Sequence, residues 1–170
     1  MKKIYTVLFM VPFLALAQPK LNVEYDKYDS VLKISTERMV IKSKMLRPDY
    51  AGFKVFRVIH KSKKAFLSNG FTNVLFIVKA DRTMSVDNKT IIKIEFDDGS
   101  IKEYNHEGGY KISLASDIVI ISFDVSEDDY LYTHKIKSFK IDGISKAYEI
   151  EGKNATIMYE NLLAVKNYKE

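Results

Sequence analysis

Apolar and charged residues alternate along the stretch between positions 91 and 104. Residues 92–96 alternate between an isoleucine or phenylalanine and a charged side chain, residues 97–100 are Asp-Asp-Gly-Ser, and residues 101–104 lead the chain back. A period of two places every second side chain on one face of a strand, and an Asp-Gly turn between two such runs is typical of a β-hairpin. The sequence therefore predicts a hairpin over residues 91–104.

Several other apolar runs predict further strands. They are residues 31–34, 39–42, 53–59, 74–78, 118–123, 136–141 and 147–150. Unbroken apolar runs such as 74–78 and 118–123 are typical of strands that are covered on both faces. The first two runs, separated by Ser-Thr-Glu-Arg, predict either one long bent strand or a hairpin. The last two are expected to pair through a turn at Asp142-Gly143.

Two segments near the C-terminus predict helices. Ser126, followed by acidic residues as far as Asp129, has the composition of a capped helix start and predicts a short helix reaching about His134. Asn154 can cap a last helix, whose apolar face comprises Met158, Leu162 and Val165, flanked by Tyr159 and Leu163. We expect an α+β fold: a mostly antiparallel β-sheet domain, as a sandwich or partial barrel, with the short helix and the C-terminal helix packed on the sheet.

Residues 1–17 have the three parts of a cleavable secretory signal peptide. Lys2 and Lys3 form a basic start, residues 5–14 are almost entirely apolar, and a small-x-small sequence ends at Ala17. The apolar run is shorter than the roughly 20 residues that span a bilayer, which disfavours a retained membrane anchor. We predict cleavage between Ala17 and Gln18, and hence an exported chain, periplasmic or secreted, without an integral membrane anchor.

The rest of the chain is expected to form one domain. Residues 18–29 are polar and predict a flexible lead-in, whereas residues 30–170 carry the strand and helix patterns without a linker or an internal repeat. Removing 17 of the 170 residues leaves 153, which is enough for one hydrophobic core.

Charge and composition exclude several classes of function. The formal net charge of +5 falls to +3 when Lys2 and Lys3 leave with the leader, so the chain has only a small basic excess and we expect no nucleic-acid partner. The absence of cysteine excludes a disulfide framework, a zinc–thiolate site, an iron–sulfur cluster and a cysteine nucleophile. We expect no cofactor.

The titratable residues offer few candidates for catalysis or metal binding. The three histidines, His60, His106 and His134, are far apart in sequence and fit no metal motif. The acidic residues between positions 124 and 129 could bind calcium, but they lack the spacing of a calcium loop, and a helix start explains most of them. We expect no metal site. If a catalytic site is assembled only in the fold, its candidates are His106, Glu107 and Asp124.

The binding candidates are tyrosines and basic residues. Four tyrosines that look exposed are candidate ligand-binding residues: Tyr25, Tyr28, Tyr50 and Tyr110. Seven of the basic residues, between positions 42 and 64, suggest a basic patch: Lys42, Lys44, Arg47, Arg57, Lys61, Lys63 and Lys64. We interpret the basic set as a solvated face, with contact to acidic glycans or lipid headgroups as the alternative.

The chain also resembles a group of bacterial proteins. Its Lys-Lys leader, which ends in Leu-Ala-Leu-Ala before Gln18, is similar to the leaders of envelope proteins of Bacteroidota. The stretch IIKIEFDDGSIKEY (91–104), the strand IKSFKI and the closing helix resemble small uncharacterised exported proteins of that group. The resemblance implies an envelope location and a β-rich fold, and it carries no activity.

These observations favour a non-catalytic binding or accessory module of the cell envelope, with a protein or a glycan as its partner. A small periplasmic hydrolase, whose site is assembled only in the fold, is the alternative. A structural or inhibitory accessory protein is a third possibility. The sequence leaves the oligomeric state open.

Overall fold

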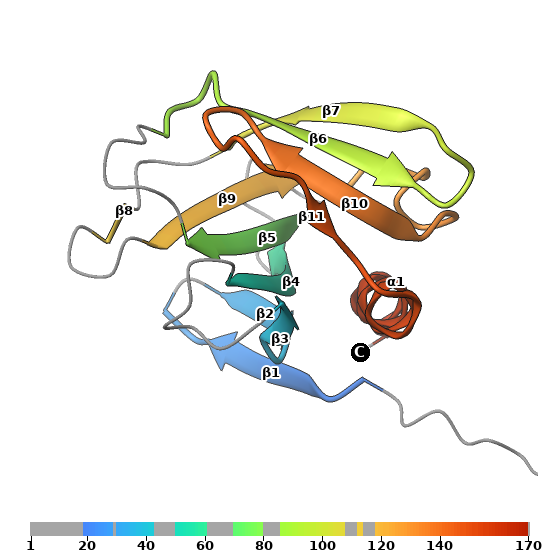
Figure 1. Ribbon diagram of the computed structural model, residues 1–170. Coiled ribbons are helices and arrows are strands. Elements are labelled where there is room, and N and C mark those ends of the chain that lie inside the picture. The colour runs from blue at the N-terminus through green and yellow to red at the C-terminus, as the bar shows by residue number, and fades with distance from the viewer. Residues whose placement is uncertain are drawn as a thin grey trace, which may run out of the picture.

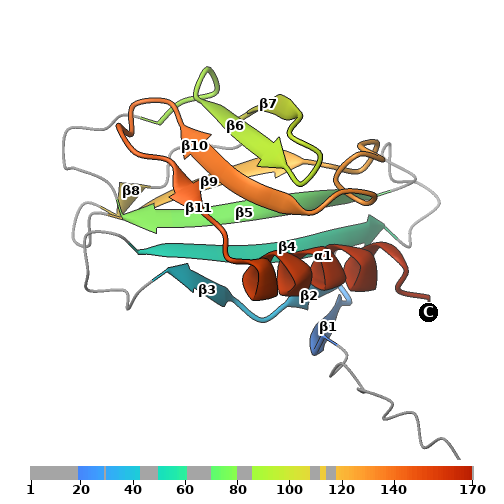
Figure 2. The ribbon, with the colours of Figure 1, turned by 45° about the vertical axis from the view of Figure 1, so that its right-hand side comes forward.

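Two antiparallel sheets pack face to face, and a helix lies along one open side between them (Figures 1 and 2). The computed structural model describes residues 19–28, 30–42, 50–60, 70–79, 86–107, 112–113 and 118–169. The larger sheet has the order β1 (Leu21–Asp26), β2 (Val31–Thr36), β4 (Ala51–His60), β5 (Phe71–Lys79), β9 (Ile118–Asp124) and β8 (Ile112–Ser113), with β3 (Met39–Lys42) also paired to β4. The smaller sheet has the order β11 (Tyr148–Glu149), β10 (Ile136–Ile141), β6 (Ile91–Phe96) and β7 (Ile101–Asn105).

The two predicted turns join strands as the sequence indicates. Strands β6 and β7 form the hairpin with Ile92 opposite Tyr104, and β10 pairs with β11 with Phe139 opposite Tyr148. The turn residue Gly99 has a φ of +84°, a conformation that glycine adopts readily. Both hairpin predictions are confirmed.

Residues 31–42 form one interrupted strand rather than a hairpin. Strand β2 pairs with β4 with Ser35 opposite Phe56, and β3 pairs with the same strand with Met39 opposite Phe53. Because β2 and β3 both run antiparallel to β4, they are two parts of one bent strand, which confirms the first of the two alternatives.

Part of the predicted flexible lead-in is a strand, and this part of the prediction is wrong. Residues Leu21–Asp26 form β1, paired along its whole length with β2. The pairing rests mainly on the backbone, because most β1 side chains are exposed, whereas the sequence argument looked for a buried apolar face.

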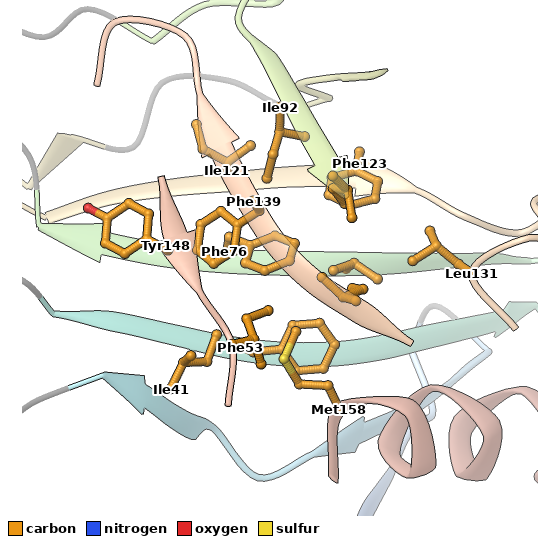
Figure 3. Close-up of a cluster of buried hydrophobic side chains, with 14 of the residues drawn as sticks. Ile41, Phe53, Phe76, Ile92, Ile121, Phe123, Leu131, Phe139, Tyr148 and Met158 are labelled. Atoms are coloured by element: carbon orange, nitrogen blue, oxygen red, sulfur yellow. The ribbon is translucent and has the colours of Figure 1, made fainter. Parts of the chain in front are cut away.

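The core lies between the two sheets and is rich in phenylalanine (Figure 3). The ring centroid of Phe76 on β5 lies 5.5 Å from that of Phe53, 6.1 Å from that of Phe123 and 4.2 Å from that of Phe139 on the opposite sheet. Phe76 therefore connects three strands of the larger sheet to the smaller one.

The two sheets are also hydrogen-bonded at one corner. The backbone N–H of Glu107, just after β7, donates to the carbonyl of Ser122 on β9 at 2.7 Å. The N–H of Ser122 donates in turn to Nδ1 of His106 at 3.1 Å. The molecule is thus a sandwich closed at this corner, and α1 (Gly152–Lys166) covers another side.

The last helix confirms the predicted apolar face and corrects its start. Met158, Leu162 and Val165 are fully buried against the sheets. The helix begins at Gly152, so Asn154 lies inside its first turn, where its Nδ2 donates to the carbonyl of Ile41 at 3.1 Å instead of capping the helix. Among the described residues, no helix has the length and apolar character needed to cross a bilayer.

The predicted short helix at 126–134 is absent from the structure, which has a series of turns there. The Ser126 hydroxyl bonds to Asp124 Oδ1 at 2.5 Å, and Asp128 Oδ1 accepts the N–H of Tyr130 at 2.9 Å. These local bonds satisfy backbone and side-chain groups in a non-helical conformation, in competition with the helix.

Candidate functional site

A pocket of about 380 Å³ opens where the C-terminal end of α1 meets the larger sheet. Its walls come from the end of β4, the start of β5, the turns after β9 and the last helical residue. The lining residues are Arg57, Gly70, Phe71, Thr72, Ser126, Glu127, Tyr132 and Lys166. The lining mixes charged, hydroxyl-bearing and apolar side chains.

Strand register brings the floor of this pocket together. Arg57 on β4 lies opposite Ile34 on β2 and opposite Thr72 on β5, so the three residues form one row across the sheet. Gly70 precedes β5 with a φ of +67°, and a Cβ at this position would lie 1.8 Å from the carbonyl oxygen of Val58. Only glycine fits this close approach of the two strands.

Two cationic side chains are held at the pocket wall. The Arg57 guanidinium donates from Nη1 to the carbonyl of Lys166 at 2.9 Å and thus caps the end of α1. The Lys166 ammonium lies 3.9 Å from the ring centroid of Tyr132 and 3.1 Å from Asp129 Oδ1. A guanidinium has five N–H donors, so this one bond leaves it further donors for a ligand.

Three residues with hydroxyl groups also line the pocket: Thr72, Ser126 and Tyr132. The backbone N–H of Thr72 donates to Ser126 Oγ at 2.7 Å, which ties β5 to the turn after β9. The side chain of Tyr132 is buried, and burial raises the pKa of its hydroxyl, while a hydrogen bond with Thr72 and the charge of Arg57 oppose the rise. The Tyr132 hydroxyl is therefore neutral at ordinary pH.

This arrangement suits recognition of an anionic group. Arginine binds a carboxylate or phosphate through paired N–H donors, and a nearby lysine adds a second positive charge. Glu127, exposed on the same wall, contributes one negative charge and favours ligands that also carry hydrogen-bond donors. The groups are positioned by contacts to the scaffold before any ligand arrives, which reduces the entropic cost of binding.

Of the predicted basic set, Arg57 is the member whose side chain the structure describes. The other six fall on residues or side chains outside the described part of the chain. Sequence reasoning did not single out Thr72, Tyr132 or Lys166, because only the fold brings them to Arg57; Lys166 is 109 positions away from it in the sequence.

The candidate catalytic residues make separate hydrogen bonds with the protein around the β7–β9 corner. His106 is buried, and its Nδ1 accepts the N–H of Ser122, so this nitrogen is committed to joining the sheets. Glu107 is exposed and contacts Ser122 through its backbone. Asp124 is exposed and accepts the N–H of Ser126 at 2.8 Å. Each therefore has a structural hydrogen bond of its own.

The four candidate tyrosines lie in different environments. Tyr25 and Tyr28 are exposed, as expected. Tyr50 is 1% exposed and packs against Ile77 and Ile118, so its prediction as a surface residue is wrong. Tyr50 directly precedes β4, and the sheet buries it. Tyr110 lies outside the described residues.

The acidic residues near position 124 are spread over separate protein contacts. Asp128 Oδ2 accepts the Tyr104 hydroxyl at 2.5 Å, and Asp129 accepts the Lys166 ammonium. Across the described ranges of the chain, no group of three histidine, aspartate or glutamate side chains is arranged to hold a metal ion.

A second polar cluster joins the β6–β7 turn to residue 134. The Tyr130 hydroxyl donates to Asp98 and lies 2.8 Å from Ser100 Oγ, and its ring stacks on His134 with centroids 4.0 Å apart. His134 Nε2 is 3.8 Å from Asp98 Oδ2. The Tyr130 hydrogen bond is the main reason that the pKa of Asp98 falls to about 2.

This cluster contains serine, histidine and aspartate but lacks the order of a hydrolase triad. The Ser100 hydroxyl bonds to Tyr130 and to the Asp98 carboxylate rather than to His134, so the histidine is not placed to act as the base of a triad. We interpret the cluster as a structural clamp between the hairpin and the turns after β9.

No protein-family model, curated protein or solved structure matches the chain.

Proposed function

We propose that this chain is an exported, non-catalytic binding module that takes an acidic group of a protein or glycan partner in the pocket at the end of α1. One observation carries the proposal: Arg57 and Lys166 lie together at a pocket with hydroxyl-bearing walls, held by bonds to the scaffold. Fixed cations and neutral hydroxyls are a means of binding, and a catalytic role would need a nucleophile beside a base.

The proposed export rests on the sequence of residues 1–17. Expression of the full chain in a Gram-negative host tests it directly. We expect the protein recovered from the envelope fraction to begin at Gln18, as determined by N-terminal sequencing and intact mass. Recovery of the uncleaved chain from the cytoplasm would contradict the proposal.

Ligand binding is tested on the protein recovered from the same expression. The probes are a glycan array that pairs uronic-acid oligosaccharides with neutral ones, and a peptide set that pairs Glu-rich with Gln-rich sequences. We expect saturable binding of an acidic probe and at least about a tenfold loss in Arg57→Gln, because a charge-assisted hydrogen bond is lost.

Two further variants distinguish ligand contact from altered folding. Arg38→Gln removes an exposed arginine that does not line the pocket, and this variant should bind as the parent does. Glu127→Gln removes a negative charge from the pocket wall and should bind an acidic probe more tightly, since it reduces repulsion. Equal binding by all four proteins, or by none to any probe, would overturn the proposed function.

A further inference from the structure

Strand β1 lies at the edge of the larger sheet. Among the described residues, no strand pairs with its outer side. It stands first in the strand order, paired only to β2 on one side, and it lies far from the smaller sheet (Figure 1). Val23 is 43% exposed and Tyr25 is 56% exposed. An exposed edge with apolar side chains is a template for another strand.

The face of β1 that carries these side chains continues the apolar inner face of the sheet. Val23 lies opposite Ile34 and Tyr25 lies opposite Leu32, both of which are buried in β2. The apolar inner surface therefore extends beyond the part of the sheet that the core covers. A strand added at this edge would continue that surface.

The sequence of the edge is complementary to itself in the antiparallel direction. When Val23 is placed opposite Val23 of a second copy, Leu21 meets Tyr25, and Lys20 meets Asp26 at both ends. Cross-strand pairs of aromatic with aliphatic residues and of opposite charges both stabilise an antiparallel ladder.

We propose that two copies of the chain associate through β1, antiparallel, with Val23 opposite Val23 of the second copy. The Lys20–Asp26 complementarity selects a second copy of the chain as the occupant of this edge. The interface is a short strand pair and is therefore small, so we expect a reversible dimer that forms with increasing concentration.

Other registers of the same strand pair would bring less favourable residues opposite one another. A shift by one residue places Leu21 opposite Asp26 or Glu24, so that apolar side chains face charged ones. A shift by two residues in one direction places Glu24 opposite its own copy, and like charges repel. The same shift in the other direction places Tyr25 opposite Pro19, which has no N–H to donate.

The dimer would place the two pockets on the same face of one continuous sheet. Val23, Ile34 and Arg57 form one row from β1 to β4, and pairing at Val23 keeps equivalent side chains on the same side. Five strand spacings then separate the two Arg57 residues, or about 24 Å. If the proposed function holds, a repetitive acidic partner could engage both pockets and gain avidity.

A cysteine scan tests both the dimer and its register, because the chain has no cysteine of its own. In Val23→Cys the two introduced thiols lie on Cα atoms about 4.5 to 5.5 Å apart, within disulfide range. In Asn22→Cys the corresponding atoms are about 8 Å apart, beyond that range. Diamide serves as the oxidant and takes two electrons and two protons from each thiol pair.

We expect Val23→Cys to form a covalent dimer about tenfold faster than Asn22→Cys. Ile101→Cys is the control for exposure, since Ile101 is 67% exposed and lies on β7, at the edge of the other sheet. If Val23→Cys forms a covalent dimer no faster than Asn22→Cys and Ile101→Cys do, the proposal is wrong.

A charge exchange tests the same pairing without a covalent bond. Sedimentation equilibrium should show a dimer that is weakened in Lys20→Asp and in Asp26→Lys, and restored when both substitutions are combined. Within one chain Lys20 pairs with Glu37 and Asp26 with Lys33, and both in-chain pairs lose their attraction in the double variant. Restored dimer formation in the double variant therefore reports the contact between copies. A parent protein that stays monomeric at all concentrations contradicts the proposed dimer. Neither measurement depends on ligand binding, so this result is separate from the test of the pocket.

Discussion

The Arg57 guanidinium and the Lys166 carbonyl join β4 to the last turn of α1 with a hydrogen bond of 2.9 Å between residues 109 positions apart. The bond satisfies a carbonyl that the helix itself leaves without a partner, and it places a cation at the negative end of the helix dipole. The same contact positions Arg57 at the pocket, so that one side chain serves both the fold and the proposed site.

Replacing Arg57 should therefore reduce stability as well as binding. In Arg57→Gln we expect the free energy of unfolding to fall by about 1 kcal/mol, because the capping bond and the favourable charge at the helix end are lost. Urea denaturation followed by circular dichroism measures the change. Arg38→Gln, which alters an exposed arginine, should leave the denaturation midpoint where it is, and an equal shift in both variants would contradict the capping role.

Phe76 should be among the most sensitive core positions. It is fully buried and contacts aromatic rings of both sheets, so Phe76→Ala should lower the free energy of unfolding by about 3–5 kcal/mol. Phe56 lies on the same sheet but is only partly buried, and Phe56→Ala should cost about 1 kcal/mol. Denaturant titration of both variants checks this order, and a reversed order would mean that Phe76 does not join the two sheets.

Asp98 should make stability depend on pH in the acid range. Its pKa is lowered from 3.8 to about 2, first through the hydrogen bond from Tyr130 and then through bonds from Ser100. Since the folded state has the lower pKa, the stability that Asp98 contributes is present above pH 3.8 and is lost as the pH falls towards 2.

Urea titrations between pH 7 and pH 2 test the contribution of Asp98. Asp98→Asn should be less stable than the parent at pH 7 and should equal it near pH 2, while Tyr130→Phe should show the same trend to a smaller extent. Asp97→Asn, one residue earlier on the turn, keeps the Tyr130 bond to Asp98 and is the matched control; at pH 7 it should be closer in stability to the parent than Asp98→Asn is. If Asp98→Asn is less stable than the parent by the same amount at pH 2 as at pH 7, the difference in stability does not come from the lowered pKa of Asp98.

Two glycines with positive φ should respond very differently to alanine. Gly70→Ala places a methyl group against the Val58 carbonyl, whereas a Cβ at Gly99 would have no heavy atom within 4 Å. We expect a loss of about 2–5 kcal/mol for Gly70→Ala, from strain and overlap together, and about 1 kcal/mol for Gly99→Ala, from backbone strain alone. Thermal denaturation of the pair measures the contrast, and similar losses would show that the close approach at Gly70 is absent.

Local sequence patterns determined much of this fold. The alternation and Asp-Gly turn at 91–104, the turn at Asp142-Gly143 and the apolar face of Met158, Leu162 and Val165 all recur in the structure as predicted. Each depends on neighbours within about one turn or one hairpin, and the periodicity of the side chains carries that information.

Tertiary contacts decided the features that the sequence left open or misplaced. The backbone pairing of β1 with β2, the burial of Tyr50 and the choice of turns over a helix after Ser126 each depend on partners in distant segments or on competing local hydrogen bonds. The pocket is the clearest case, since strand register and the docking of α1 bring Arg57, Thr72 and Lys166 together, and no periodicity along the chain encodes which strands become neighbours.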